Sequence, residues 1–552
     1  MKQIANTVLL IFFLIGTAML QGQDSKIIEI RKAGGSTQDE ERFPGANILL
    51  KDRENRVHLF HEGALIVSDR AYFYKRSNFF KAEGDIVFTQ GDSLRMTCDY
   101  IEYDGKTKKA KAWGNVFLKR PDTTLKTDTL FLNRVEKKAF YNTRGVIVDS
   151  TSTLTSNKGT YFMDEKKYRF VSEVDIVNPE YRVNSQQLDY FTETDHAYLY
   201  GKSRIVGETY EILCEQGFYD LSVEKGYFKK NAVIFYDQKI IEGDSLYFEN
   251  DLQYAAATNN ISILDSINNS IITGHYGEIF KAKDSAIITK RALAINLVEK
   301  DSLFIHADTL MATGPDEKKI LRGFYDVRIF KKDLKGKSDS IYIDESVGLT
   351  KLHHRPLTLK EEQVFTEADR NQKNPVLWFD ESQMTGNEIF LISNPKTNAL
   401  DSLKIRGNAF IIEKDSLSAD GYNQIQGGIL DGEFKEGRLD NIVVTKNTQM
   451  IYYLYNDEDM QLIGIDKTTC SAMKMQFEDG EIGDITFFVA PDGNVYPEED
   501  IPTNERTLKG FIWREEERPN QVEDLFSEED NIFQLNKVKT TIREGDEKVA
   551  GP

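Results

Sequence analysis

The sequence predicts an all-β protein built as an elongated β-jelly roll or β-solenoid of stacked two-strand repeats. Between residues 46 and 500 the chain consists of short segments rich in Val, Ile, Phe, Tyr and Leu, separated by turns such as Asp104-Gly105. Apolar and polar residues alternate in several of these segments, which favours strands over helices. A repeat of about 29 residues indicates that the strands stack unit on unit.

The repeat is defined by residues that recur on one pleat face. A large apolar or aromatic residue closes a strand every 29 residues, and the residue two positions earlier shares its face. A second motif, a small polar pair before an apolar strand, runs at nearly the same interval, as at Gly84-Asp85 and Gly114-Asn115. Each repeat therefore supplies two strands, and two facing sheets of such strands leave an open V-shaped apolar groove. The closing residues are Tyr103, Leu132, Tyr161, Tyr190, Tyr219 and Phe248, and the residues two positions earlier are Ile101, Leu130, Gly159, Leu188, Gly217 and Leu246.

Residues 1–22 are interpreted as a cleaved signal peptide, and residues 23–45 as an N-terminal linker. The run from Val8 to Ile15 is wholly apolar and is followed by small residues, which is typical of exported proteins. Its eight residues fall short of the roughly 20 that cross a bilayer as a helix. An uncleaved N-terminal anchor is the alternative.

The repeat predicts three further divisions of the chain. Residues 46–348 form the main repeat region, and residues 376–497 form a second β region in which the pattern is looser. Between them, residues 349–375 are polar and are expected to be an interdomain loop. Residues 498–552 are expected to be an acidic flexible tail, because the stretch from Glu515 to Asp530 holds eight acidic residues against one arginine.

The sequence offers no catalytic residues, no metal site and no cofactor site. The GDSL tetrapeptides that begin at Gly91 and Gly243 resemble a hydrolase signature, but similar triplets recur without the glycine at Asp128 and Asp401, so they are turn-to-strand entries. The seven histidines are scattered. Three cysteines cannot form a closed disulfide framework, and we expect them to pack in the core. A net charge of -19 makes nucleic acid a poor partner.

Three sequence blocks and their spacing resemble the OstA-like family of periplasmic proteins of lipopolysaccharide transport. The blocks are Cys98–Tyr103 (CDYIEY), Lys109–Val116 (KAKAWGNV) and Ser185–Tyr190 (SQQLDY). The resemblance implies a β-jelly roll whose apolar interior holds the acyl chains of lipopolysaccharide. It also implies that the protein stacks end to end, through edge strands, with other jelly-roll transport components or with itself.

These observations together predict a non-enzymatic, periplasmic lipopolysaccharide-binding protein that shields acyl chains during transfer to the outer membrane. Whether it associates with the inner or the outer membrane is left open. The side chains expected to line the lipid groove share the apolar phase of the repeat. They are Ile86, Phe88, Ile101, Tyr103, Val116, Leu118, Leu130, Leu132, Ile147, Tyr161, Leu188, Tyr190, Tyr219, Val233, Phe235, Leu246 and Phe248.

The alternative is a structural β-solenoid scaffold of the envelope with a filled core and no lipid ligand. The volume of the inward side chains separates the two readings only weakly. Gly159 and Gly217 leave room for a guest, whereas the many Tyr and Phe side chains could fill that room.

Overall fold

The computed structural model describes residues 27–533, except for residues 93, 122, 209, 221, 224, 237–238, 250, 268, 298–301, 316–317, 357, 365, 396, 398, 436–437, 457, 459 and 479–480. The expected signal peptide therefore lies outside the described residues. Strands dominate the described part of the chain, and the all-β prediction is confirmed. The chain divides into two compact units: unit 1 holds residues 1–237 and 241–252, and unit 2 holds residues 238–240 and 253–552.

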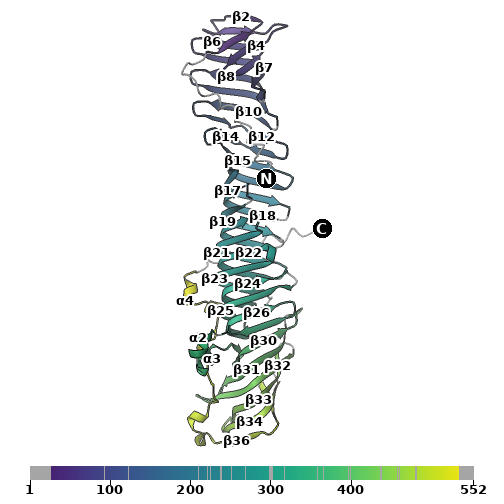
Figure 1. The fold of residues 1–552 in the computed structure, drawn as a ribbon, viewed down its shortest axis with the longest axis vertical. Helices are drawn as coiled ribbons and strands as arrows, with labels where there is room; N and C mark the ends of the chain where they lie inside the picture. Colours follow the sequence, from purple (N-terminus) through teal and green to yellow (C-terminus); the bar gives the residue numbers. More distant parts are fainter. Residues whose placement is uncertain are drawn as a thin grey trace. The chain divides into compact units, whose positions relative to one another are not determined.

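Unit 1 is a series of antiparallel strands in which adjacent long strands pair with each other, whereas several short strands pair across one or two intervening strands (Figure 1). The last strand, β20, begins with two residues that belong to unit 2. The strands are β1 (Glu29–Lys32), β2 (Gly35–Thr37), β3 (Asn47–Leu50), β4 (Val57–His61), β5 (Ala64–Ser68), β6 (Arg70–Tyr74), β7 (Phe79–Gln90), β8 (Leu94–Asp104), β9 (Lys109–Lys119), β10 (Thr124–Asn133), β11 (Lys138–Tyr141), β12 (Gly145–Val148), β13 (Thr153–Ser156), β14 (Lys158–Phe162), β15 (Lys167–Val177), β16 (Tyr181–Phe191), β17 (His196–Gly207), β18 (Tyr210–Asp220), β19 (Lys225–Tyr236) and β20 (Lys239–Glu249).

Each long strand of unit 1 turns a corner near its middle. The register with the neighbouring strand shifts there, and residues such as Gly114 and Asn115 have positive φ, 77° and 52°. Glycine and asparagine adopt this conformation at little steric cost, so the small polar pairs of the sequence mark the corners. A bulge redirects a strand, so that the two halves of the strand belong to two facing sheets. Phe80 and Ile86, which lie on either side of the corner of β7, belong to one apolar cluster.

The two motifs of the sequence repeat therefore lie on successive strands, as expected. The block that begins at Cys98 lies in β8, and the Gly114-Asn115 pair lies in β9. These strands have 11 residues each, which is longer than the apolar segments visible in the sequence. The reason is that one strand continues through the polar corner, so that each apolar segment is only half of a strand.

Unit 2 continues the antiparallel pattern with strands that lengthen to 18 residues in β33. Short 3₁₀ turns lie at Lys281–Lys283, Glu498–Asp500, Thr503–Glu505, Glu515–Glu517 and Val522–Leu525. The elements are β21 (Tyr254–Asp265), β22 (Ser270–Phe280), β23 (Ser285–Asn296), β24 (Leu303–Thr313), β25 (Ile320–Phe330), β26 (Leu334–Asp344), β27 (Leu349–His353), α2 (Leu359–Val364), α3 (Glu367–Lys373), β28 (Val376–Phe379), β29 (Ser382–Thr385), β30 (Glu388–Ser393), β31 (Leu400–Lys414), β32 (Tyr422–Lys435), β33 (Arg438–Tyr455), β34 (Leu462–Glu478), β35 (Glu481–Phe488), β36 (Asp492–Tyr496) and α4 (Glu528–Asn531).

The segment 349–375, expected to divide the chain, lies inside unit 2. It contains β27, which pairs with both β26 and β30, and the two short helices α2 and α3. The compact units divide near residue 252 instead. The polar composition that suggested a linker belongs to surface helices, which also present polar side chains to water.

Residues 498–533, named here the C-terminal strap, lie against unit 2. Gln424 donates a hydrogen bond to the carbonyl of Arg506 and accepts one from the amide of Leu508, at 2.9 and 2.8 Å. Farther along, Arg328 donates to the carbonyl of Asp524, and α4 at the end of the strap lies beside β23 (Figure 1). We expected a flexible tail here. The difference arises because the body binds the backbone of the strap, which acidic composition does not reveal.

Candidate functional site

One inward-facing row of apolar side chains runs across the strands of unit 1. Directly paired residues of neighbouring antiparallel strands point to the same face of a sheet, so a chain of such pairs defines a row. We name this set the groove row. Its members, each paired with the next, are Leu59, Ile66, Phe88, Met96, Leu118, Leu125, Ile147, Leu154, Ile176, Val183, Ile205, Ile212 and Ile234.

The exposure of the groove row changes along unit 1. Leu59 and Ile66 are buried, as are the members on β8, β9 and β10. From Ile147 onward most members are partly exposed although they point inward, and Ile212 is the buried exception. The partly exposed members are Ile147, Leu154, Ile176, Val183, Ile205 and Ile234. These six side chains form an apolar inward surface that the protein leaves partly uncovered.

A second inward row, rich in aromatic residues, lies on the other half of the strands. We name it the tyrosine row. Burial raises the pKa of Tyr161, Tyr168 and Tyr190 above the ordinary value, so these phenols are neutral at physiological pH. Its members, each paired with the next, are Phe80, Tyr103, Ala110, Leu132, Ala139, Tyr161, Tyr168, Tyr190, Ala197, Tyr219 and Gly226.

Most residues expected in the groove occupy inward positions. Phe88, Leu118 and Ile147 belong to the groove row. Ile86 and Val116 lie close to the corners and are each 1% exposed. Leu246 and Phe248 lie in β20, where Leu246 is buried and Phe248 is partly exposed. The other candidates at inward positions are Tyr103, Leu132, Tyr161, Tyr190 and Tyr219 in the tyrosine row, and Ile101, Leu130 and Leu188 two residues nearer the corner of their strands.

The assignment of Val233 and Phe235 to the groove is wrong, because both point outward. Phe235 pairs with Glu211, which forms an ion pair with Arg204 at 2.6 Å, and its side chain is 38% exposed. The corner of β19 at residues 230–231 shifts the alternation by one residue. Ile234 is therefore the groove-row member on this strand.

The sequence reasoning missed most other groove-row members, among them Ile176, Val183 and Ile205. The alternation of residues beside each corner could have identified them. Val174 and Ser185 are paired at the inward position next to the corner, and Ile176 and Val183 are paired at the next inward position. Of the groove row, the sequence assigns Phe88, Leu118 and Ile147 to the groove, because its most regular repeat lies on the other half of each strand.

The glycines expected to leave room for a guest are covered by aromatic and aliphatic side chains. A Cβ atom at Gly159 would lie 2.4 Å from the ring of Tyr141. At Gly217 it would lie 3.0 Å from Leu199 and 3.2 Å from Phe228. The space above both glycines is therefore already filled by the protein itself.

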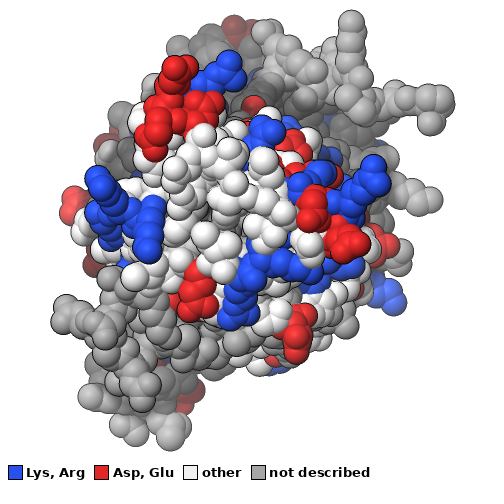
Figure 2. All heavy atoms as spheres, turned by 90° about the horizontal axis from the view of Figure 1, so that it is seen from above, with Lys and Arg blue, Asp and Glu red and all other residues white. Residues whose placement is uncertain are grey.

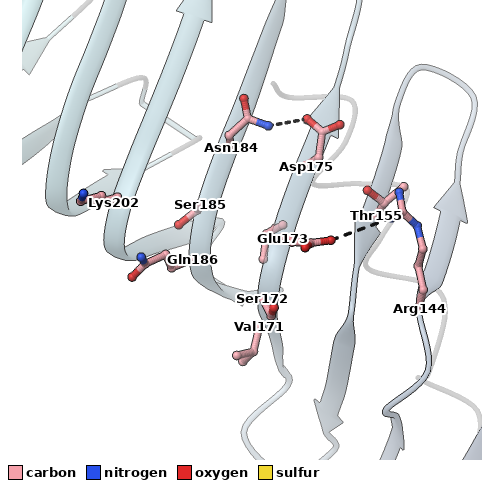
Figure 3. A pocket seen from close by; sticks show the side chains of 11 residues that line it. Arg144, Thr155, Val171, Ser172, Glu173, Asp175, Asn184, Ser185, Gln186 and Lys202 are labelled. Carbon is pink, nitrogen blue, oxygen red and sulfur yellow. Dashed lines mark hydrogen bonds and ion pairs between the residues drawn. The ribbon is translucent and has the colours of Figure 1, made fainter.

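A polar notch of 740 Å³ lies at the corners of β15, β16 and β17 (Figure 3). Arg144 and Glu173 face each other across it at 4.0 Å, and Asn184 donates a hydrogen bond to Asp175. The charged side chains of the notch have both signs. Arg144 and Glu173 are more than half exposed, so they are well hydrated and do not form a preorganised binding site.

The described residues contain no group of three or more potential metal ligands. Cys98, Cys214 and Cys470 are buried free thiols, which confirms that they pack in the core. Burial raises the pKa of the Cys98 thiol to about 12 and that of the Cys214 thiol to about 11. Within the part of the chain that the structure covers, no helix has the length and apolarity needed to cross a membrane.

Unit 1 thus belongs to the class of antiparallel β-jelly rolls with cornered strands and an apolar interior. Residues 25–186 match the model of the OstA-like protein family, so this part of the chain is an OstA-like region and the resemblance seen in the sequence is confirmed.

Among solved structures, the chain is similar to a protein from Pseudomonas aeruginosa. This is LptH, described as the LptA-homologous periplasmic component of the conserved lipopolysaccharide transport device. The alignment has 14% sequence identity and a TM-score of 0.18, and it covers 19% of this chain and 81% of LptH. No curated protein matches the chain.

Proposed function

We propose that this protein is a non-enzymatic, periplasmic lipopolysaccharide-binding protein that shields acyl chains during their transfer to the outer membrane. The observation that carries the proposal is the partly exposed stretch of the groove row. Four of its members, from Ile147 to Val183, fall within the OstA-like region. An inward apolar surface that its own protein leaves partly uncovered is suited to an apolar guest.

The dimensions of this stretch suit a lipid. It crosses seven strands, from β12 to β19, and neighbouring strands are about 4.8 Å apart, so it is about 29 Å long. The hydrocarbon core of a bilayer is about 30 Å thick, and each leaflet contributes half of it. An acyl chain laid along the groove row would therefore be covered over its whole length.

The energetics favour transfer over release. Moving an acyl chain out of water is favourable by about 0.8 kcal/mol per CH₂ group. Extraction from a membrane into the groove exchanges one apolar environment for another, and transfer between two matched grooves is nearly neutral. Directional transport then requires an energy source outside this chain.

The N-terminal end of unit 1 is suited to the end-to-end stacking that we propose. There β1 pairs with β4 and β2 pairs with β3, and every residue of β1 and β2 is exposed. Figure 2 shows uncharged residues over the middle of this end, with charged residues around them. Edge strands of this kind add a strand from another jelly roll through backbone hydrogen bonds.

A scaffold without a lipid is the second candidate, and the filled part of the interior favours it. The side chains of Phe80, Ile86 and Val116 are each 1% exposed, and Tyr141 covers Gly159. A filled core of this kind needs no guest to be stable. The two candidates differ in what they predict for the groove row.

Site-specific photocrosslinking separates the two candidates. A benzophenone side chain at Ile176 or Ile205, in the groove row, should capture lipopolysaccharide in intact cells. The same group at Phe235, which points outward, is the matched control and should not. Equal capture at all three positions, or none at Ile176 and Ile205, would contradict lipid binding in the groove.

A further inference from the structure

Arg120 is a buried arginine on the inward face of unit 1. It directly follows β9, and Val116, Leu118 and Arg120 occupy successive inward positions. Leu118 is a member of the groove row, so Arg120 lies beside that row, at the edge of its partly exposed stretch. The residue is 5% exposed, and its Nε and Nη2 atoms have no hydrogen-bond partner.

Other arginines of unit 1 that are partly screened from water have acidic partners. Arg169 binds Asp189 through two hydrogen bonds of 2.8 and 2.6 Å, and Arg134 forms an ion pair with Glu62. No ion pair of Arg120 occurs among the described residues. A buried cation without a counter-ion is costly, and buried charges in proteins are normally paired.

The surroundings of Arg120 are aromatic and polar rather than acidic. Burial lowers the pKa of its guanidinium, whereas the nearby phenols of Tyr168 and Tyr161 raise this pKa. Both tyrosines belong to the tyrosine row on the facing half of the strands. The guanidinium therefore lies beside the apolar groove row and within electrostatic reach of the phenols of Tyr168 and Tyr161.

We propose that Arg120 binds the phosphate group of an amphiphile whose acyl chains lie along the groove row. The inference rests on the proposed lipid binding and names the group that orients the lipid. A guanidinium presents donors in a planar fork that matches a phosphate, and such charge-assisted hydrogen bonds are strong in a buried site. The phenols of Tyr161 and Tyr168 act on this guanidinium and carry hydroxyl groups that can donate to an anion.

Calorimetric titration of the full chain with paired single-chain probes tests the proposal. Dodecyl phosphate carries the anion, dodecyl maltoside has the same chain with an uncharged head, and inorganic phosphate is the anion without a chain. R120Q should weaken the binding of dodecyl phosphate by about tenfold or more and change that of dodecyl maltoside by less than about twofold. R144Q, which alters an exposed arginine of the same unit, is the matched control and should change neither.

Three other results would contradict the anion site, the lipid binding or both. Equal binding of dodecyl phosphate by R120Q and the wild type overturns the anion site but leaves the proposed lipid binding intact. Failure of the wild type to bind either amphiphile overturns both. Inorganic phosphate binding as tightly as dodecyl phosphate would mean a free-anion site.

A stability measurement excludes a structural role for the charge. Without ligand, R120Q should melt at a temperature no lower than the wild type, because the substitution removes an uncompensated charge. Asp122 lies outside the described residues. If D122N and R120Q both destabilise the ligand-free chain to the same extent, the guanidinium has a carboxylate partner within the protein and the proposal fails.

Discussion

Replacing Gln383 by leucine should loosen the C-terminal strap without unfolding unit 2. Gln383 is fully buried, donates a hydrogen bond of 2.8 Å to the carbonyl of Ile512 and accepts one of 2.7 Å from the amide of Arg514. Leucine is of similar size but makes neither bond. At about 1 kcal/mol for each bond lost, the closed strap is destabilised by about 2 kcal/mol, which raises its opening equilibrium about 30-fold.

Hydrogen exchange measured by mass spectrometry reports this opening directly, because amides of a locally opened segment exchange while the rest stays protected. Peptides covering 506–518 should exchange about 30-fold faster in Q383L, whereas peptides from β31 to β34 should be unchanged. Q372L is the matched control: Gln372 is exposed, and among the described residues its side chain binds the side chain of Glu517. An increase of less than about threefold in Q383L, or an equal increase in Q372L, would refute the reasoning.

Three further outcomes are expected. Hydrogen bonds and ion pairs with Arg514 and Lys337 outweigh the effect of burial and lower the pKa of Glu517 to about 2. The contribution of Glu517 to strap binding should therefore be complete above about pH 4.5 and be lost as the pH falls towards 2, and E517Q should remove this pH dependence from the hydrogen exchange of the strap. The three cysteines should react with a thiol reagent only at the rate of unfolding, since they are buried and the pKa of each thiol is raised. G159A should lower the free energy of unfolding by about 1–3 kcal/mol through its clash with the Tyr141 ring, as measured by denaturant titration.

Each of these outcomes has a result that contradicts it. Strap exchange that is equally pH-dependent in E517Q and the wild type would show that another group titrates. Rapid labelling of any cysteine in the folded chain would contradict its burial. G35A, at a glycine with no atom within 4 Å of an added Cβ, is the control for G159A, and equal stability of G159A and the wild type would contradict the clash.

The OstA-like resemblance and the two-strand repeat follow from sequence because they depend on local rules. Aromatic residues at a 29-residue interval set the tyrosine row, and small polar pairs such as Gly114-Asn115 set the corners, since few residue types tolerate positive φ. The same corners explain why Phe235 was misplaced. A bulge inserts a residue into the alternation, and whether the next residue points inward depends on how the neighbouring strand pairs across it.

The sequence by itself determined the all-β class, the period of the repeat and the inward orientation of most residues that it assigns to the groove, because alternation and turn chemistry act between residues close in the chain. Only the tertiary structure decided which inward residues stay partly exposed, that Tyr141 covers Gly159, and that Gln383 holds a segment about 130 residues away. These features depend on side chains brought together from distant strands. Arg120 shows the same limit: its sequence context is an ordinary turn, and its burial without a partner exists only once two sheets face each other.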